Sequence, residues 1–321
     1  MLSGCSFLAE PQAEGTTPDF VLTYAENQAE DYPTTLGAYR FAELVSEKTD
    51  GRVVIQIHAG GTMGDEQSVV EQLQFGGVDF ARVSISSLSE FVKEMNVLQL
   101  PYLYTGSQHM WKILDGQIGD HFLEALDGSG MVGLSWYDAG ARNFYTSTGF
   151  VRTPDDLAGQ RIRVQESVLM ARMVEAFGGE AVQQSFETVY SALEKGQVDG
   201  AENNWPSYES EKHYEVAPYV TVDEHTRVPE MQLVSQVTWD KLPEEYQEII
   251  RDSAQESAQY ERELWQERTV QSRAAVVSAG CQVLELSSGE KEQFRQKVLP
   301  LYREFCADYL DLVDEIVAAG R

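Results

Sequence analysis

Residues 41–80 read FAELVSEKTDGRVVIQIHAGGTMGDEQSVVEQLQFGGVDF, and their hydrophobic pattern changes from helical to strand-like twice. The β-branched run 53–57 (VVIQI) is typical of a buried strand. Asp65 is placed to cap the next helix, and Gly76 ends that helix. Residues 78–85 then alternate as a second strand. This order of strand, helix and strand predicts an α/β sheet.

The same order of elements extends to both sides of this stretch. Residues 20–24 (FVLTY) predict an opening strand, and Thr34 or Thr35 is placed to cap the helix that follows it. Further along, residues 193–199 (LEKGQVD) share Leu, Gly, Val and Asp with residues 73–79 (LQFGGVD) at identical spacing. The match suggests two similar lobes, although any helix that glycine ends before a buried strand would look alike.

One long helix is predicted near the C-terminus. Residues 244–279 contain neither Gly nor Pro, and their apolar positions keep an interrupted helical spacing. At 1.5 Å per residue, a continuous helix over this range would approach ~50 Å. Such a length exceeds what one lobe of about 150 residues can cover. We therefore expect this helix to lie across both lobes.

Charge and composition argue against a nucleic-acid partner and against a membrane-spanning segment. The 321 residues carry 52 acids against 24 Lys and Arg, a formal charge of −28 that repels phosphate backbones and anionic lipid head groups. No apolar run approaches the roughly 18 to 20 residues of a membrane-spanning helix. We therefore expect no nucleic-acid partner and no crossing of a bilayer. The acidity suits a salty or extracellular setting, and a merely solvated surface explains it equally well.

The first eighteen residues are predicted to lie outside the folded body. Residues 1–5 (MLSGC) resemble the end of a bacterial lipobox, in which signal cleavage leaves Cys5 as the lipid-bearing N-terminus. We interpret residues 1–18 as a truncated lipoprotein leader and a flexible tether, with a chance LSGC as the alternative. The other two cysteines, Cys281 and Cys306, are free or paired, and the three together show no zinc-binding spacing.

No motif for catalysis, a cofactor or a metal stands out in the chain. Residues 128–133 spell GxGxxG, but they follow an apparent helix and precede a strand, which reverses the order of a dinucleotide-binding turn. The acid pairs 155–156 and 244–245 each follow a proline at an expected helix start, where carboxylates stabilise free amides. The five histidines lie far apart in the sequence. We expect no cofactor, no metal site and no enzymatic activity.

Three arginines lie among polar and aromatic residues: Arg82 in DFARVS, Arg142 in DAGARNFYTS and Arg163 in GQRIRVQES. A guanidinium offers a planar fork of donors that matches a carboxylate. Arg161 and Arg163 alternate with apolar residues, so a strand would place both arginines on one face. The pattern indicates handles for an organic anion, with a surface ion pair to one of the 52 acids as the alternative.

Four segments carry a family resemblance. They are residues 41–80 quoted above, VLQLPYLY (97–104), TPDDLAGQRIRVQES (153–167) and FETVYSALEKGQVDGAENN (186–204). Over residues 20–320 the chain resembles the DctP family, the solute-binding proteins of tripartite ATP-independent periplasmic (TRAP) transporters. The resemblance implies a two-lobed α/β fold of the periplasmic-binding-protein-like (Venus flytrap) kind, with a cleft between the lobes and one long helix spanning both lobes.

The chain is expected to cross between these lobes. Lobe I would comprise residues 19–139 plus 229–268, and lobe II residues 140–228 plus 269–321. An open cleft would bind the ligand, and the lobes would then rotate about the crossing segments. The closed form would be delivered to the membrane subunits without any chemical step.

The resemblance also implies a ligand-binding site in the cleft. Arg163 would form the salt bridge with a substrate carboxylate, Arg142 would be a second arginine at the ligand, and Phe186 would pack on the ligand. Tyr32 and His225 could instead cap a helix or fill a polar hole under the cleft. The full expected set is Arg163, Arg142, Asn203, Phe186, Arg82, Glu26, Asn27, Asn204, Trp205, Tyr32 and His225.

The expected ligand is a sugar acid, a uronate such as D-glucuronate or D-galacturonate. Glu26 and the asparagines would supply hydroxyl partners, and Trp205 with Tyr208 could cover a pyranose face. A C4-dicarboxylate is the nearest alternative, whereas a neutral ligand would leave the paired arginines uncompensated. Further alternatives are a glycosidase or lyase with Glu26 or Glu202 as general acid, and a surface sensor that signals through a partner.

The expected partners are the organic acid and the small and large membrane subunits of a TRAP transporter. The resemblance implies an extracytoplasmic protein, either periplasmic or anchored to the outer face of the cytoplasmic membrane. Contact with the membrane is expected only through a lipid on Cys5.

Overall fold

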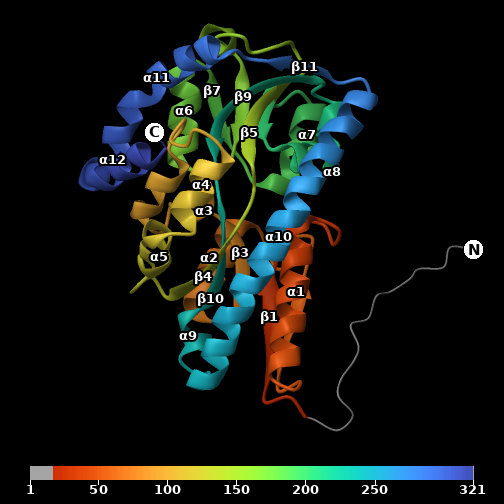
Figure 1. The fold of residues 1–321 in the computed structure, drawn as a ribbon. Coiled ribbons are helices and arrows are strands. Elements are labelled where there is room, and N and C mark those ends of the chain that lie inside the picture. Colours follow the sequence, from red (N-terminus) through yellow and green to blue (C-terminus); the bar gives the residue numbers. More distant parts are fainter. Residues whose placement is uncertain (1–16, 321) are drawn as a thin grey trace, which may run out of the picture.

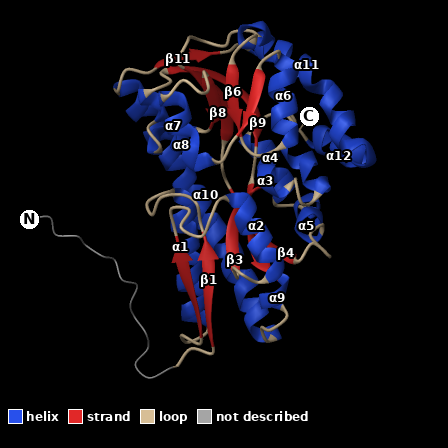
Figure 2. Ribbon diagram, turned by 180° about the vertical axis from the view of Figure 1, so that it is seen from behind, coloured by secondary structure: helices blue, strands red, loops and turns tan. Residues whose placement is uncertain are grey.

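The computed structural model of the protein describes residues 17–320, and its strands form two separate sheets. Figure 1 shows one sheet above the other with helices around each, and Figure 2 shows the same arrangement from behind. Cys5, which is predicted to carry a lipid, lies outside the described residues, as does nearly all of the predicted leader and tether.

The first sheet is built, in spatial order, from β2 (Val53–His58), β1 (Phe20–Ala25), β3 (Phe80–Ser84), β10 (Glu230–Ser235) and β4 (Met131–Tyr137). β1 is parallel to β2 and β3, whereas β10 is antiparallel to β3 and β4. The rings of Tyr24 and Phe80 stack with centroids 6.4 Å apart, and Phe41 of the adjoining helix meets Phe80 edge to face. These aromatic side chains form the centre of a buried core on one face of the sheet.

The second sheet is built, in spatial order, from β11 (Gln282–Glu285), β9 (Tyr219–Arg227), β5 (Ala141–Thr146), β8 (Gly200–Asn203), β6 (Arg161–Val164) and β7 (Glu180–Gln183). β6 is parallel to β7 and β8, and β9 is parallel to β11, whereas β5 is antiparallel to both of its neighbours. Because β6 and β8 are parallel, their carboxyl ends lie at the same edge of the sheet. Arg163 and Asn203 are therefore brought to one edge.

Helices connect and cover these strands. Before the long helix they are α1 (Pro33–Lys48), α2 (Glu66–Phe75), α3 (Ile85–Leu88), α4 (Ser107–Leu114), α5 (Gln117–Glu124), α6 (Val168–Phe177), α7 (Val189–Glu194), α8 (Trp205–Ser210) and α9 (Gln236–Trp239). After it they are α11 (Ser288–Cys306) and α12 (Leu310–Ala319). Short 3₁₀ helices are η1 (Lys93–Gln99), η2 (Pro154–Leu157), η3 (Phe186–Thr188), η4 (His213–Glu215) and η5 (Ala307–Tyr309).

The long helix α10 (Glu244–Ser278) has 35 residues and confirms the helix predicted for residues 244–279. Near its start, Ile250 packs into the core of the first sheet, and near its end Val276 packs into the core of the second sheet. Between them, Glu261 is buried and accepts a hydrogen bond from the backbone N–H of Asp138 at 2.8 Å, just after β4. The helix therefore packs against both halves of the molecule (Figure 1).

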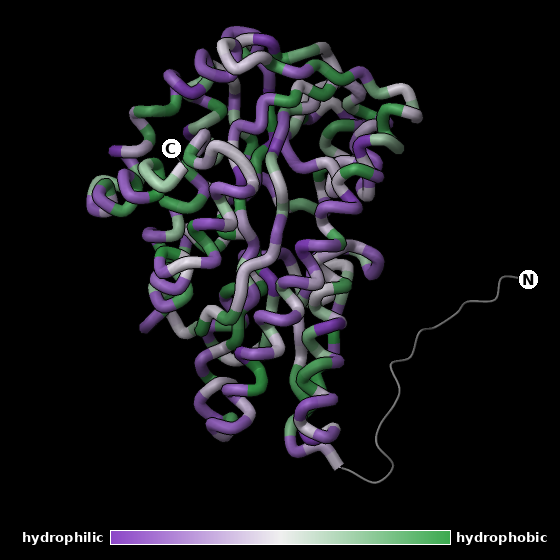
Figure 3. Tube along the Cα trace, viewed as in Figure 1, coloured by the Kyte–Doolittle hydropathy of each residue, from purple (hydrophilic) through white to green (hydrophobic). Residues whose placement is uncertain are grey.

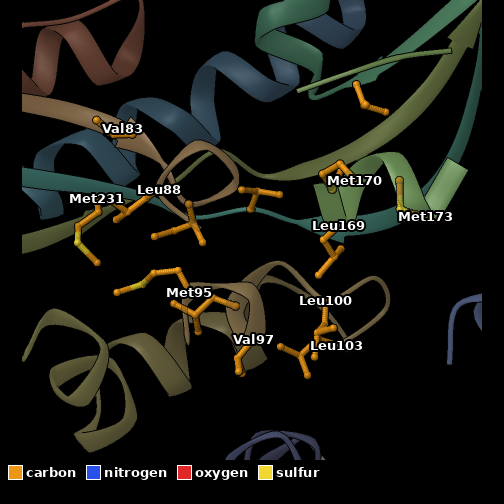
Figure 4. Close-up of a cluster of buried hydrophobic side chains, with 14 of the residues drawn as sticks. Val83, Leu88, Met95, Val97, Leu100, Leu103, Leu169, Met170, Met173 and Met231 are labelled. Carbon is orange, nitrogen blue, oxygen red and sulfur yellow. The ribbon is translucent and has the colours of Figure 1, made fainter. Parts of the chain in front are cut away.

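A buried apolar cluster connects the two halves through residues 85–103. Leu88 and Met95 of this segment lie near Met231 of the first sheet, and the cluster continues to Met170 on α6 beside the second sheet (Figure 4). Burying each such side chain stabilises the fold by about 1.5 to 3 kcal/mol. Apolar packing thus supports the region between the sheets on this side.

The strands of each sheet come from two parts of the chain. Those of the first sheet lie within residues 20–137 and 230–235, and those of the second within residues 141–227 and 282–285. The chain therefore passes between the sheets three times: from β4 to β5, from β9 to β10, and from β10 through α10 to β11. The lobe boundaries stay a prediction, because membership of a sheet does not assign the helices to a lobe.

Both ends of α2 lie where the sequence analysis predicted them. Asp65 accepts a hydrogen bond from the backbone N–H of Ser68 at 2.8 Å and so caps the helix. Gly76 follows the helix with a φ of 74°, a left-handed conformation that glycine adopts because it has no Cβ.

The start of α1 differs from the prediction. The helix begins at Pro33, whose φ suits the first helical position, and Tyr32 precedes it as the cap residue. The prediction that Thr34 or Thr35 caps this helix was wrong, since the proline allows the helix to begin earlier. Residues 128–133 lead from α5 into β4, so the GxGxxG sequence does not join a strand to a helix.

Two further properties concern the whole described chain. Within residues 17–320, no helix is both long enough and apolar enough to cross a membrane, and Figure 3 shows hydrophilic and hydrophobic residues intermixed along the trace.

Cys281 and Cys306 are buried and free rather than paired. Burial raises the pKa of the Cys306 thiol to about 12, so this thiol stays protonated at neutral pH.

Candidate ligand-binding site

A cavity that is partly open to solvent lies between the two sheets, with about 570 Å³ of empty space when the solvent at its mouth is included. One side is formed by the starts of α1 and α2 with strands β3 and β10, and the other by β5, β6 and β8 with the start of α8. The predicted site residues that line it are Asn27, Tyr32, Arg82, Arg142, Arg163, Phe186, Asn203 and Asn204. Both sheets therefore contribute walls of the cavity, so its shape depends on how the two sheets are placed relative to each other.

Arg163 on β6 lines the cavity, and its side chain is buried. Its Nε and Nη2 atoms donate to the backbone carbonyl of Gln184 at 2.8 and 2.5 Å, which fixes the side chain. Its Nη1 atom is buried without a hydrogen-bond partner, and no carboxylate within residues 17–320 forms a salt bridge with it. Burial lowers the pKa of Arg163, because a desolvated cation is destabilised. A ligand carboxylate would supply the missing charge and acceptors.

Arg142 lines the same cavity from β5, but its charge is already neutralised. Its Nε and Nη2 atoms both donate to the carboxylate of Glu202 on β8, with a distance of 2.8 Å for Nη2. Its Nη1 atom donates to Oδ1 of Asn203 at 3.0 Å. The prediction that a neutral ligand would leave Arg142 uncompensated was therefore wrong, since the carboxylate of Glu202 pairs with it.

Arg82 on β3 is enclosed by three carboxylates. Its Nε and Nη2 atoms donate to Glu26, and its Nη1 atom donates to Glu66 at 2.8 Å and to Glu230 at 2.5 Å. Nη2 also donates to Oδ1 of Asn27. A guanidinium has five N–H donors, so every donor of Arg82 already has an acceptor. Arg82 lines the cavity without a donor left for a ligand.

The wall near α8 and α10 combines aromatic and polar groups. The rings of Tyr32 and Trp265 meet edge to face with centroids 5.8 Å apart, and the Tyr32 hydroxyl lies 2.7 Å from Oγ of Ser207. Asn204 caps α8 by accepting a hydrogen bond from the backbone N–H of Ser207 at 2.8 Å. Phe186 lines the cavity from the start of η3. Apolar surfaces beside a few placed polar groups are typical of small-molecule sites.

Trp205 does not line the cavity, although Asn204 directly before it does. Its side chain packs into the core of the second sheet, with its ring 6.3 Å from that of Tyr208. The guanidinium of Arg273 lies 5.3 Å from the centre of the same ring. Asn204 caps α8 and Trp205 is the first helical residue, and the two neighbouring side chains lie in different surroundings, the first at the cavity and the second in the core.

Glu26 and His225 also lie behind the cavity wall rather than in it. Glu26 is buried against Arg82, as described above. His225 is buried between two carboxylates, with Nδ1 2.8 Å from Asp223 and Nε2 3.3 Å from Glu202. Burial alone would lower the pKa of His225, but Asp223 and Glu202 raise it to about 9. His225 is therefore charged at neutral pH and supports the wall by ion pairing.

We expect the free energy of unfolding to fall between about pH 6.5 and pH 9. The pKa of His225 is raised to about 9, above its unfolded value, so its stabilisation is complete below about pH 6.5 and lost as pH rises through 9. One pKa unit corresponds to about 1.4 kcal/mol, which makes the fall on the order of 3 kcal/mol across this window. Urea denaturation at several pH values measures it. The variant His225→Asn should lack this part of the slope, and equal slopes in both proteins would contradict the expectation.

Several lining residues lie outside the predicted set, among them Glu66, Glu230 and Trp265. Glu66 is the first residue of a helix, where acids are common because they stabilise free amides. Glu230 starts β10 just after the chain crosses between the sheets, and Trp265 keeps the apolar spacing of α10. No local signal in the sequence separates these residues from ordinary structural ones.

Comparisons with known proteins agree with this architecture. Residues 24–308 match the sequence model of the bacterial extracellular solute-binding protein family 7, DctP. A solute-binding protein of Chromohalobacter salexigens is 36% identical over 281 residues, which cover 88% of this chain and 83% of the relative. A C4-dicarboxylate-binding protein of Bacillus subtilis is 29% identical over 91% of this chain and 84% of its own length.

Solved structures are similar over almost the whole fold. A TRAP periplasmic solute-binding protein from Bradyrhizobium in complex with D-galacturonate has a TM-score of 0.90 and 37% identity, covering 92% of this chain and 99% of that one. A TRAP protein from Chromohalobacter salexigens with bound D-glucuronate has a TM-score of 0.89 and 35% identity, covering 93% and 99%. The predicted two-lobed α/β fold with one long helix is confirmed. The chain belongs to the DctP family of extracellular solute-binding proteins, the family of the TRAP transporter receptors.

Proposed function

We propose that the protein captures a uronate, such as D-glucuronate or D-galacturonate, and hands it to the membrane subunits of a TRAP transporter. The observation that carries this proposal is Arg163, a residue of the cavity lining whose buried guanidinium has an unpartnered Nη1 and no carboxylate partner among residues 17–320. A buried cation in that state is costly, and a ligand carboxylate compensates it. Binding of an organic acid therefore supplies the salt bridge that Arg163 lacks among the described residues.

The groups around Arg163 suit a ligand with hydroxyls as well as a carboxylate. Oδ1 of Asn203 accepts from Arg142 at 3.0 Å and from the backbone N–H of Asn204 at 2.8 Å, which directs its amide nitrogen toward other acceptors. Tyr32 and Trp265 add aromatic surface beside these polar groups. A pyranose ring needs both kinds of contact, because its edges are polar and its faces are partly apolar. Support also comes from the uronates bound in the Bradyrhizobium and Chromohalobacter structures.

Two features disfavour the catalytic alternative, a glycosidase or lyase. Burial alone would raise the pKa of Glu202, but Arg142 and His225 lower it to about 2, so its carboxylate has no proton to donate near neutral pH. Glu26 accepts hydrogen bonds from Arg82 and lies outside the cavity lining. Neither carboxylate suits a general acid, and the family consists of transport receptors.

The delivery step and the location are parts of the same proposal. We place the protein outside the cytoplasmic membrane, with a lipid on Cys5 as its anchor and the small and large TRAP subunits as its partners. Family membership supports an extracytoplasmic receptor that works with membrane subunits. The residues proposed to contact the ligand are Arg163, Asn203, Asn204, Asn27, Phe186 and Tyr32.

A thermal-shift panel tests the ligand class. Uronates, aldonates and C4-dicarboxylates are added separately at equal concentration, and a ligand at 100 times its Kd should stabilise the folded protein by about 2.7 kcal/mol. We expect D-glucuronate or D-galacturonate to raise the Tm by several degrees and succinate and malate to raise it far less. A larger shift with a C4-dicarboxylate would contradict the proposal. Recovery of the uronate unchanged after long incubation separates a receptor from a hydrolase or lyase.

A further inference from the structure

The two ends of the cavity differ in which hydrogen-bonding groups remain free. At the Arg163 end the unpartnered group is a donor, Nη1 of the guanidinium. At the Arg82 end all five guanidinium donors are used, as described above. Oε2 of Glu230 accepts from Arg82 at 2.5 Å, while its Oε1 has no partner within residues 17–320. The Arg82 end therefore presents acceptors to a ligand.

Carboxylates outnumber cations at the Arg82 end, and Asp65, Glu166 and Glu187 are further acids of the cavity lining. One arginine contacts the carboxylates of Glu26, Glu66 and Glu230, and no other cation forms a salt bridge with these acids among the described residues. Glu66 and Glu230 both line the cavity, whereas Glu26 lies behind them. Their side chains are only 13% and 11% exposed, so water screens their charges weakly. A second ligand carboxylate placed there would meet like charges in a poorly solvated space.

We propose that Glu66 and Glu230 determine specificity by accepting hydroxyl groups of the ligand and rejecting a second carboxylate. This inference rests on the proposed function, since it takes the Arg163 end as the place of the first carboxylate. The cavity then selects sugar acids with a single carboxylate and hydroxyls at the far end. Aldarates and C4-dicarboxylates, which carry a carboxylate at each end, bind weakly although they match the charge of Arg163.

Binding of three related acids tests the inference by isothermal titration calorimetry at pH 8. D-Galacturonate reports the proposed site, while galactonate and galactarate share one open carbon chain and differ only in the second carboxylate. The measurement is performed on the wild type and on Glu66→Gln and Glu230→Gln, which keep the shape of each side chain. Glu256→Gln, an exposed acid of α10, is the control for the loss of one negative charge.

We expect the wild type to bind galactonate at least about 30-fold more tightly than galactarate, by the like-charge argument above. Each cavity variant should raise the affinity for galactarate relative to galacturonate by about 10-fold or more, and Glu256→Gln should leave this ratio unchanged. Retained galacturonate binding with no rise in that ratio would overturn the inference and leave the proposed function standing. If the wild type binds no uronate at all, the proposed function is overturned instead.

Discussion

Arg163→Ala should weaken uronate binding by about 2 to 5 kcal/mol, which is a loss of about 30- to 5,000-fold in affinity. Among the three arginines that line the cavity, Arg163 has a buried, unpartnered donor, and it forms no salt bridge with a carboxylate among residues 17–320. The ligand carboxylate is expected to be its only ion-pair partner, so no neighbouring group replaces it after substitution. Isothermal titration calorimetry with D-galacturonate and D-glucuronate measures the effect.

Two further variants separate the loss of this contact from a general disturbance. Arg161→Ala removes an arginine of the same strand that pairs with Asp199 on the surface, and it should leave ligand affinity unchanged. Arg163→Lys keeps the charge but loses the planar fork, so it should bind more tightly than the alanine variant and less tightly than the wild type. Equal affinities for the wild type and Arg163→Ala, in folded proteins, would contradict the assigned role.

Glu202→Gln should lower the free energy of unfolding by about 3 to 5 kcal/mol. Glu202 is fully buried and pairs with both Arg142 and His225. The substitution keeps the volume of the side chain but removes the negative charge, which leaves buried positive charge without compensation. Urea denaturation at pH 7 measures the loss.

Asp199→Asn is the matched control for this prediction, because Asp199 forms an ion pair with Arg161 at the surface, where water screens the charges. Its loss of stability should be much smaller than that of Glu202→Gln. Similar losses in the free energy of unfolding of the two variants would contradict the expectation that burial makes the Arg142–Glu202 pair more important for stability than a surface pair. The pKa of His225 gives a second readout, since removing Glu202 should lower it from about 9.

Local patterns in the sequence predicted much of the architecture. The cap at Asp65, the stop at Gly76 and the long helix α10 were all correct, because each depends on residues within a few positions of one another. The start of α1 was wrong because Pro33 was not considered as a first helical residue. Fold class followed from the alternation of elements together with the family resemblance.

The candidate site was predicted in part. Arg163, Arg142 and Asn203 were expected at the cleft and do line the cavity, although their contacts with a ligand stay a prediction. Trp205 was expected beside them and packs into a core instead, because its surroundings depend on how α8 packs against residues far away in the sequence. Glu66 was missed because an acid at a helix start has an ordinary structural explanation.

The sequence by itself determined many of the elements that form and the presence of three arginines in an acidic chain. Only the tertiary structure decided which arginine is free to bind a ligand. Arg142 is neutralised by a residue 60 positions away, and Arg82 by residues 16, 56 and 148 positions away. Ion pairs of this kind form through folding of distant segments rather than through local spacing. An arginine without an ion-pair partner, such as Arg163, can therefore be identified only from the folded structure, which shows all the residues around it.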